Sequence, residues 1–166
     1  MVRSILYATD LGLYAPYVLQ HALSLAHAYR AELYVVHAVE PMGLFAESVL
    51  QTYLDQERLQ DLRGGGLHTV MCNIEQRVLE AFREEMAEAV QDMSMISAVH
   101  VLQGDPPQVI LDEAHKLGAD LLVLGSHSHG ARLDIPLGRT AARVLQLSEV
   151  PVYLVPMLQH RGRGEL

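Results

Sequence analysis

The stretch LLVLGSHSHGARLDIPLGRT, residues 121–140, decides the fold of this chain. It begins with an aliphatic run, continues through a polar loop that contains glycine, and leads into a helical pattern. A continuous aliphatic run is typical of a buried parallel strand. The first backbone N–H groups of a following helix have no intrahelical partner and carry partial positive charge, so an anion is favoured there. The stretch therefore predicts a parallel α/β sheet with an anion-binding loop.

Length, composition and charge exclude several classes of protein. The 166 residues, half of them hydrophobic, predict one compact domain over residues 1–158 and a polar C-terminal tail over residues 159–166. A formal net charge of -8 argues against nucleic acid or an anionic membrane as a partner. Lys116 is the single lysine and no G-x-x-x-x-G-K-[ST] string occurs, which excludes a P-loop ATPase.

Cysteine use and the N-terminal sequence bear on the compartment. Cys72 is alone, so neither a disulfide framework nor a cysteine metal cluster is expected. The opening MVRSILYATD holds too short an apolar segment for a signal peptide, and no run reaches membrane-spanning length. We therefore expect a cytoplasmic location.

Aliphatic runs alternate with helical patterns in the order that builds a parallel sheet. We expect strands at residues 5–9, 33–39, 98–103, 120–124 and 151–155. Helices are expected at residues 14–29, 47–62, 74–92, 107–117 and about 135–147, with a glycine loop at 63–68. Residues 41–73 thus form part of an unusually long crossover between the second and third strands. The fold class is α/β.

Four strings in this order resemble the universal stress protein family: ILYATDLG (5–12), YVVHAVE (34–40), GDPPQVILDEAHKLGADLLVLGSHS (104–128) and VPVYLVP (150–156). The resemblance covers nearly the whole chain. It implies a five-stranded parallel sheet in the order 3-2-1-4-5 with helices on both faces. It also implies a homodimer, formed by pairing the last strand, from Pro151 to Val155, across a two-fold axis. A signalling partner is implied as well, but the sequence does not identify it.

Some members of this family bind ATP through G-x-x-G, nine further residues and G-[ST]. On this chain the pattern begins at Gly125, has Ser128 in place of the second glycine, reaches Gly138 as the third, and has Arg139 in the Ser/Thr position. Ser128 restricts a turn that glycine leaves free. Arg139 fits two interpretations equally, a bidentate phosphate ligand or a solvated helix residue. Thr140 offers a hydroxyl one residue late, and within a helix that begins near residue 135 it is expected to point elsewhere.

The resemblance also implies an adenosine site at the strand ends. Asp10 follows the first strand and can accept hydrogen bonds from a ribose or an adenine amino group, or it can cap the next helix. Ala38 occupies the place where relatives offer a small residue to adenine. The predicted nucleotide-binding residues are Ala8, Thr9, Asp10, Ala38, Leu124, Gly125, Ser126, His127, Ser128, Gly138, Arg139 and Thr140. The predicted ligand is ATP or another adenine nucleotide, with Mg²⁺ as its counterion.

Histidines give no metal or catalytic prediction. His127 and His129 form an H-x-H string, but two ligands on a loop do not make a site, and His127 is interpreted as part of the loop. His37 lies in an aliphatic strand and is interpreted as a hydrogen-bonded core or crevice histidine rather than a catalytic base. No catalytic residue and no intrinsic metal site are predicted.

Three functional hypotheses follow. The first is a non-catalytic, dimeric stress-response module whose crevice, at the carboxyl ends of the first and fourth strands, binds ATP or AMP. The second is a dimeric protein-interaction module that has lost nucleotide binding, with Ser128 and Arg139 marking the loss. The third is a weak ATP hydrolase that depends on Asp10, and it ranks behind the others because no positioned general base or magnesium carboxylate is evident.

Overall fold

The computed structural model describes residues 1–40, 52, 76–77, 80, 94–127 and 137–157. Apart from the isolated positions in these ranges, the helices predicted at 47–62 and 74–92, the loop at 63–68 and the tail lie outside the described residues. In the described ranges, no helix combines the length and the apolar character needed to cross a membrane.

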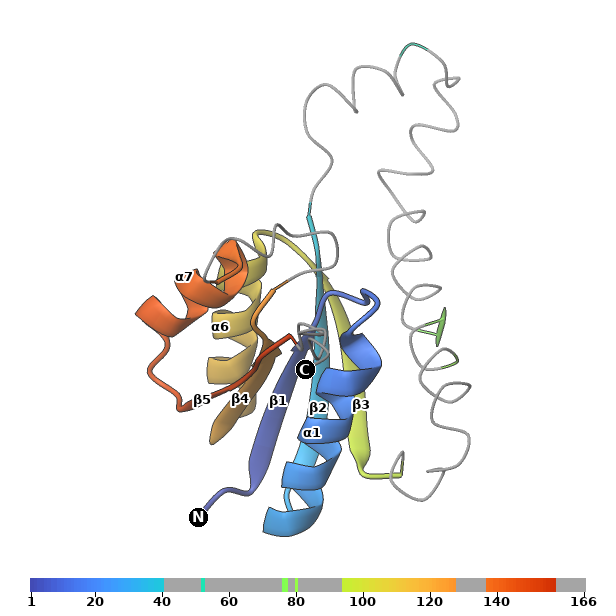
Figure 1. Cartoon of the computed structure of the whole chain (residues 1–166), viewed down its shortest axis with the longest axis vertical. Coiled ribbons are helices and arrows are strands. Elements are labelled where there is room, and N and C mark those ends of the chain that lie inside the picture. The colour runs from blue at the N-terminus through green and yellow to red at the C-terminus, as the bar shows by residue number, and fades with distance from the viewer. Residues whose placement is uncertain (41–51, 53–75, 78–79, 81–93, 128–136, 158–166) are drawn as a thin grey trace, which may run out of the picture.

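Five parallel strands form one sheet in the order β3-β2-β1-β4-β5 (Figure 1). The strands are β1 (Ser4–Thr9), β2 (Glu32–Val39), β3 (Ile96–Gln103), β4 (Leu121–Gly125) and β5 (Val152–Val155). All four neighbouring pairs are parallel, which confirms the predicted sheet and strand order. The strand ends fall within two residues of the predicted ones.

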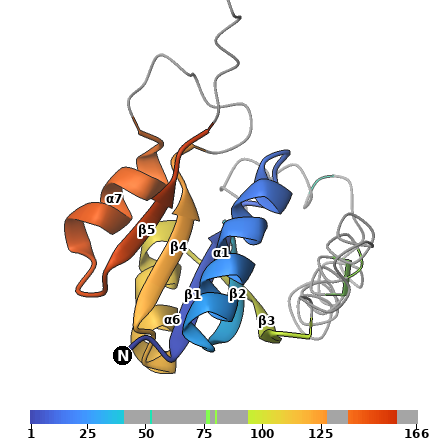
Figure 2. The same ribbon diagram turned by 60° about the horizontal axis from the view of Figure 1, so that its bottom comes forward.

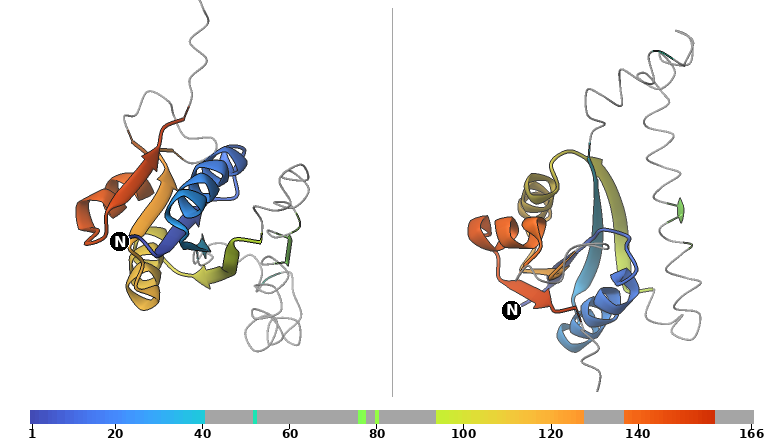
Figure 3. Two further views of the ribbon diagram at one scale, coloured as in Figure 1. Left: turned by 90° about the horizontal axis from the view of Figure 1, so that it is seen from below. Right: turned by 45° about the horizontal axis from the view of Figure 1, so that its top comes forward.

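Helices cover both faces of the sheet, as expected. The helix α1 (Ala15–Tyr29) lies on one face, and α6 (Pro106–Leu117) and α7 (Arg139–Leu147) lie on the other (Figure 3). Successive strand side chains point to opposite faces, so Ile5 and Tyr7 pack with α1 while Leu6 packs with α6 and α7. Burial on both faces is the reason that these strands are aliphatic without alternation.

The start of α7 differs from the prediction of about residue 135. The helix begins at Arg139, and Gly138 precedes it with φ -63° and ψ 152°. In a helix from residue 135, the Gly138 amide would donate to the carbonyl of residue 134. Instead it donates to the carbonyl of Ser126, at 2.8 Å. A contact with the end of β4 therefore holds residue 138 in an extended conformation, and α7 begins later in the chain than predicted.

The carboxyl ends of β1, β2 and β4 lie together at one edge of the sheet, between α1 and the pair α6 and α7 (Figure 2). Strand order reverses between β1 and β4, because the chain runs outward to β3 on one side and to β5 on the other. Open α/β sheets bind ligands at this point.

At the opposite edge, Asp120 joins the beginnings of β4 and β1. Its Oδ2 accepts hydrogen bonds from the backbone amides of Arg3 and Ser4, at 2.8 and 3.2 Å. The Arg3 amide, followed by the Ser4 amide, holds the pKa of Asp120 below its ordinary value of 3.8.

Asp120→Asn tests this junction through the pH dependence of stability. A carboxyl whose folded-state pKa is depressed stabilises the fold above its unfolded-state pKa and loses that contribution as pH falls through the folded-state value. We expect the wild-type chain to have a higher free energy of unfolding than Asp120→Asn near pH 7, with a smaller difference near pH 3. Urea unfolding at both pH values measures it. Glu149→Gln, which alters an exposed carboxylate, is the matched control. A difference that does not change with pH would contradict the role of the charge.

Candidate functional site

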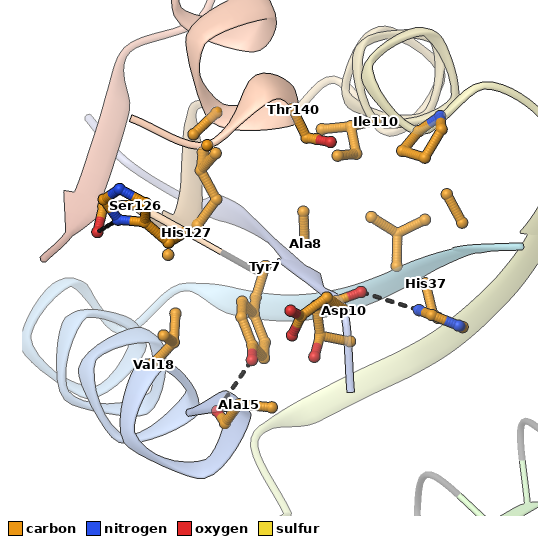
Figure 4. Close-up of a pocket in the computed structure, with 18 of the residues that line it drawn as sticks. Tyr7, Ala8, Asp10, Ala15, Val18, His37, Ile110, Ser126, His127 and Thr140 are labelled. Atoms are coloured by element: carbon orange, nitrogen blue, oxygen red, sulfur yellow. Dashed lines mark hydrogen bonds between the residues drawn. The ribbon is translucent and has the colours of Figure 1, made fainter. Parts of the chain in front are cut away.

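A pocket of about 360 Å³ opens at the carboxyl ends of β1, β2 and β4. The strand ends form its floor, α1 forms one wall, and α6 with α7 forms the opposite wall (Figure 4). The volume falls within the range of small-molecule sites, roughly 300–1,000 Å³. The pocket therefore has the position and the size of a ligand site.

The structure brings together eleven of the twelve predicted residues around this pocket. Ser128 lies outside the described residues. The lining includes Ala8, Thr9, Asp10, Ala38, Leu124, Gly125, Ser126, His127, Gly138, Arg139 and Thr140. Their convergence follows from the parallel sheet, since strand ends and helix starts meet at the same edge.

Ser126 joins three segments at the end of β4. It is 5% exposed, and its amide donates to the carbonyl of Val155 at 2.8 Å while its own carbonyl accepts from Gly138. Its Oγ accepts from the amide of Met157 at 3.0 Å and lies 2.9 Å from Nδ1 of His127. One residue thus ties β4 to β5, to the start of α7 and to the loop histidine. Sequence reasoning included Ser126 only as a ligand contact and missed this role, because its partners are distant in the chain.

The N-terminus of α7 faces the pocket. The first intrahelical hydrogen bond runs from the amide of Ala142 to the carbonyl of Gly138, at 2.9 Å. The amides of Arg139, Thr140 and Ala141 therefore have no acceptor within the helix, and all three residues line the pocket. Such amides, with the helix dipole behind them, attract an anion.

Thr140 lines the pocket rather than pointing elsewhere (Figure 4). The expectation that it points away was wrong because it placed the residue in the second turn of a longer helix. With α7 beginning at Arg139, Thr140 is the second helical residue and lies at the pocket wall.

Asp10 closes the turn after β1 and does not cap α1. Its Oδ1 accepts from the amide of Gly12 at 2.9 Å, and the amide of Leu11 donates to Oγ1 of Thr9 at 3.1 Å. Leu11 has φ 59°, a left-handed conformation that these two side chains support. The residue that precedes α1 is Tyr14, so the capping alternative for Asp10 is wrong. The exposed carboxylate of Asp10 lies on the pocket lining.

His37 is hydrogen-bonded in the crevice, as expected. Its Nδ1 lies 2.9 Å from the carbonyl oxygen of Thr9 (Figure 4). A carbonyl only accepts hydrogen bonds, so Nδ1 carries the proton and donates. This bond links the end of β2 to the end of β1, beside Ala38.

Tyr7 anchors α1 beneath the pocket, a role that the sequence did not indicate. Its hydroxyl donates to the carbonyl of Ala15 at 2.9 Å in a buried position (Figure 4). Burial raises the pKa of Tyr7, and the nearby carboxylate of Asp10 raises it further. The phenol therefore stays protonated at neutral pH and acts as a hydrogen-bond donor.

An ion pair stands at the rim of the pocket. Nη2 of Arg139 lies 3.7 Å from Oε1 of Glu40, which directly follows β2. The two side chains are 89% and 62% exposed, and both residues line the pocket. Sequence reasoning did not select Glu40, although a charged residue directly after a central strand is a usable signal. The described residues contain no group of three or more His, Cys, Asp or Glu side chains arranged to hold a metal ion.

A family model described as the Universal stress protein family matches residues 1–156. The chain belongs to the universal stress protein family. Universal stress protein A homolog 1 of Coxiella burnetii is 27% identical over 158 residues, which cover 93% of this chain and 96% of that relative. The match and the fold agree with the resemblance found in the four sequence strings.

Solved structures show the same fold. The hypothetical protein MJ0577 superposes with a TM-score of 0.71 at 21% identity, over 96% of this chain and 99% of that one. A universal stress protein solved in complex with cAMP superposes with a TM-score of 0.53 at 16% identity, over 93% and 97% of the two chains.

Ser126→Ala tests the junction of this universal stress protein at β4, β5 and α7. The change removes the acceptor of the Met157 amide and a partner of His127. We expect the free energy of unfolding to fall by about 1–3 kcal/mol, because a partly buried donor loses its acceptor. Ser24→Ala is the control, since within the described residues its exposed hydroxyl bonds only to the carbonyl of Gln20 on α1, and we expect it to change stability by less than about 0.5 kcal/mol. Equal urea midpoints for the two variants would contradict this account.

Proposed function

We propose that this universal stress protein binds an adenine nucleotide in the pocket and acts as a non-catalytic stress-response module. The observation that carries the proposal is that three α7 residues whose amides have no acceptor within the helix, together with Asp10, line the same cavity of about 360 Å³. One end of the pocket attracts an anion, and the other offers an acceptor for hydroxyl or amino groups. A nucleotide has this distribution of charge and hydrogen-bond donors.

In this proposal the phosphate lies at the start of α7, near the loop of Gly125 to His127. The ribose lies beside Asp10, whose carboxylate accepts hydroxyl hydrogen bonds. The adenine lies near Ala38, over the apolar side chains of Val36 and Ile110. The neighbour in complex with cAMP supports an adenine nucleotide as the class of ligand. Mg²⁺, where present, arrives with the nucleotide.

A binding role fits the lining residues better than a catalytic one. The Tyr7 hydroxyl and Nδ1 of His37 already donate to backbone carbonyls. Among the lining residues that the structure describes there is no lysine to neutralise a leaving phosphate. Nucleotide binding therefore acts by favouring one conformation of the pocket edge over another.

Thermal unfolding with and without AMP, cAMP, ADP and Mg-ATP tests the proposal. A ligand at about 100 times its dissociation constant adds about 2.7 kcal/mol to the folded state, which raises the unfolding midpoint. We expect Gly138→Leu to abolish the shift without unfolding the chain, because φ -63° and ψ 152° suit any residue while the added side chain occupies the pocket wall. Gln146→Leu, at an exposed position later in α7, should retain it. A shift that survives in Gly138→Leu would exclude this pocket, and no shift with any nucleotide would favour a protein-interaction module.

We also propose that two copies pair through β5. In the described part of the chain β5 pairs only with β4, which leaves its other edge available to a second strand. Tyr153 on β5 is 37% exposed, and Leu145 and Leu147 of the neighbouring helix are 39% and 46% exposed. Tyr153 contacts His21 of α1 and so lies on the α1 face of β5, whereas α7 covers the other face. Partly exposed apolar side chains thus come from both layers next to the open strand edge.

Light scattering of Tyr153→Asp tests the dimer. We expect a dimeric wild-type chain and a variant shifted toward the monomer, because a charge beside the open strand edge opposes association. Leu13→Asp is the control, since Leu13 is 72% exposed in the turn before α1, away from β5. A monomeric wild type, or an equal shift in both variants, would exclude β5 as the interface.

A further inference from the structure

The Arg139–Glu40 ion pair connects the start of α7 with the end of β2. Among the described residues of the pocket lining, no other ion pair joins these two elements. Arg139 is the first residue of α7, and Glu40 follows the last residue of β2. Both line the pocket, and both side chains are largely exposed. The pair therefore lies at the open rim, where an entering ligand meets it before reaching the floor.

The described residues of the pocket lining include more acidic than basic side chains. Among the lining residues in the described ranges, Arg139 is the only arginine or lysine, and the carboxylates are Asp10 and Glu40. The two histidines of the lining are already engaged, His37 with the Thr9 carbonyl and His127 with Ser126. Among the described residues of the lining, a phosphate consequently meets one guanidinium and two carboxylates.

A phosphate and Glu40 compete for the same guanidinium. Arg139 binds phosphate in a bidentate manner only when its planar group turns away from the carboxylate at 3.7 Å. Glu40 is then left without that partner, close to the phosphate. Each further phosphate group of the ligand adds negative charge, for which the described lining supplies no second arginine or lysine.

We propose that the Arg139–Glu40 pair selects ligands by phosphate charge, so that the pocket prefers a nucleoside monophosphate to a triphosphate. Arg139 is the phosphate-binding side chain, and Glu40 is its internal competitor. This inference rests on the proposed function, since it concerns the same pocket. Arg139 stands in the Ser/Thr position of the family pattern. In this proposal the arginine determines which nucleotide binds, and its presence does not mark a loss of nucleotide binding.

Calorimetry with adenosine, AMP, ADP and ATP in Mg²⁺-free buffer tests the inference. The variants are Glu40→Gln, Arg139→Gln and the double variant, each checked for an unchanged unfolding midpoint. The readout is the affinity for each nucleotide divided by the affinity for adenosine, which separates phosphate recognition from adenosine recognition. Glu149→Gln is the control for Glu40→Gln, and Arg143→Gln is the control for Arg139→Gln. Each control changes the net charge as its test variant does, at an exposed position outside the pocket lining.

We expect the wild type to bind AMP more tightly than ATP. Glu40→Gln should raise the AMP-to-adenosine affinity ratio roughly two- to fivefold, because it removes an exposed charge that competes with the phosphate. The ATP-to-adenosine affinity ratio should rise by more, because ATP carries more negative charge. Arg139→Gln should lower the AMP-to-adenosine ratio about tenfold, and in its presence Glu40→Gln should have little further effect.

The outcomes distinguish the two proposals. If the wild type binds adenosine and AMP but the two single variants behave as their controls do, the charge selection is wrong and the nucleotide site stands. If the wild type binds ATP more tightly than AMP without Mg²⁺, the charge selection is also wrong and the nucleotide site stands. If the wild type binds none of the four compounds, the proposed function fails and this inference fails with it.

Discussion

The hydrogen bond from the amide of Gly138 to the carbonyl of Ser126, 2.8 Å long, sets where α7 begins, and the pocket depends on that position. It fixes the start of α7 directly beside the ends of β4 and β5. Arg139, Thr140 and Ala141, whose amides have no acceptor within the helix, thereby lie on the pocket wall instead of within a longer helix. Ser126 makes this possible because its remaining hydrogen bonds, to Val155 and Met157, hold the strand end still.

The opposite wall is positioned by a different set of contacts. Tyr7 bonds to the first residue of α1, and Asp10 with Thr9 holds the left-handed turn at Leu11 that leads into that helix. A buried phenol in β1 thus sets the distance between the sheet and α1, while Thr9 at the end of the strand and Asp10 after it shape the turn. The pocket exists because both helices begin at the sheet edge where the strands end, a consequence of parallel order with a reversal between β1 and β4.

Much of this could be predicted from the sequence, for identifiable reasons. The aliphatic runs that end at Thr9 and at Leu124 predicted strands because burial on both faces requires such runs. The family resemblance supplied the strand order. The start of α7 could not be predicted, since it depends on a contact between residues 126 and 138 rather than on the local pattern from residue 135. The orientation of Thr140 and the anchoring role of Tyr7 were missed for the same reason, because both depend on tertiary contacts.

The departures of this chain from the ATP-binding pattern change the charge at the mouth of the pocket. Arg139 brings a guanidinium to the rim, where the carboxylate of Glu40 faces it, so the mouth of the pocket carries charges that a Ser or Thr would not supply. The helix amides behind it are backbone groups and do not depend on the side chain at that position. A pocket can thus keep the backbone part of an anion site while its side chains change which anion fits.

The most direct test is an NMR titration of the ¹⁵N-labelled chain with AMP, following every backbone amide. The account predicts the largest chemical-shift changes at the amides of Arg139, Thr140 and Ala141, with smaller changes at Asp10 and Ala38. Changes confined to β5, or an unchanged spectrum at saturating AMP, would contradict it.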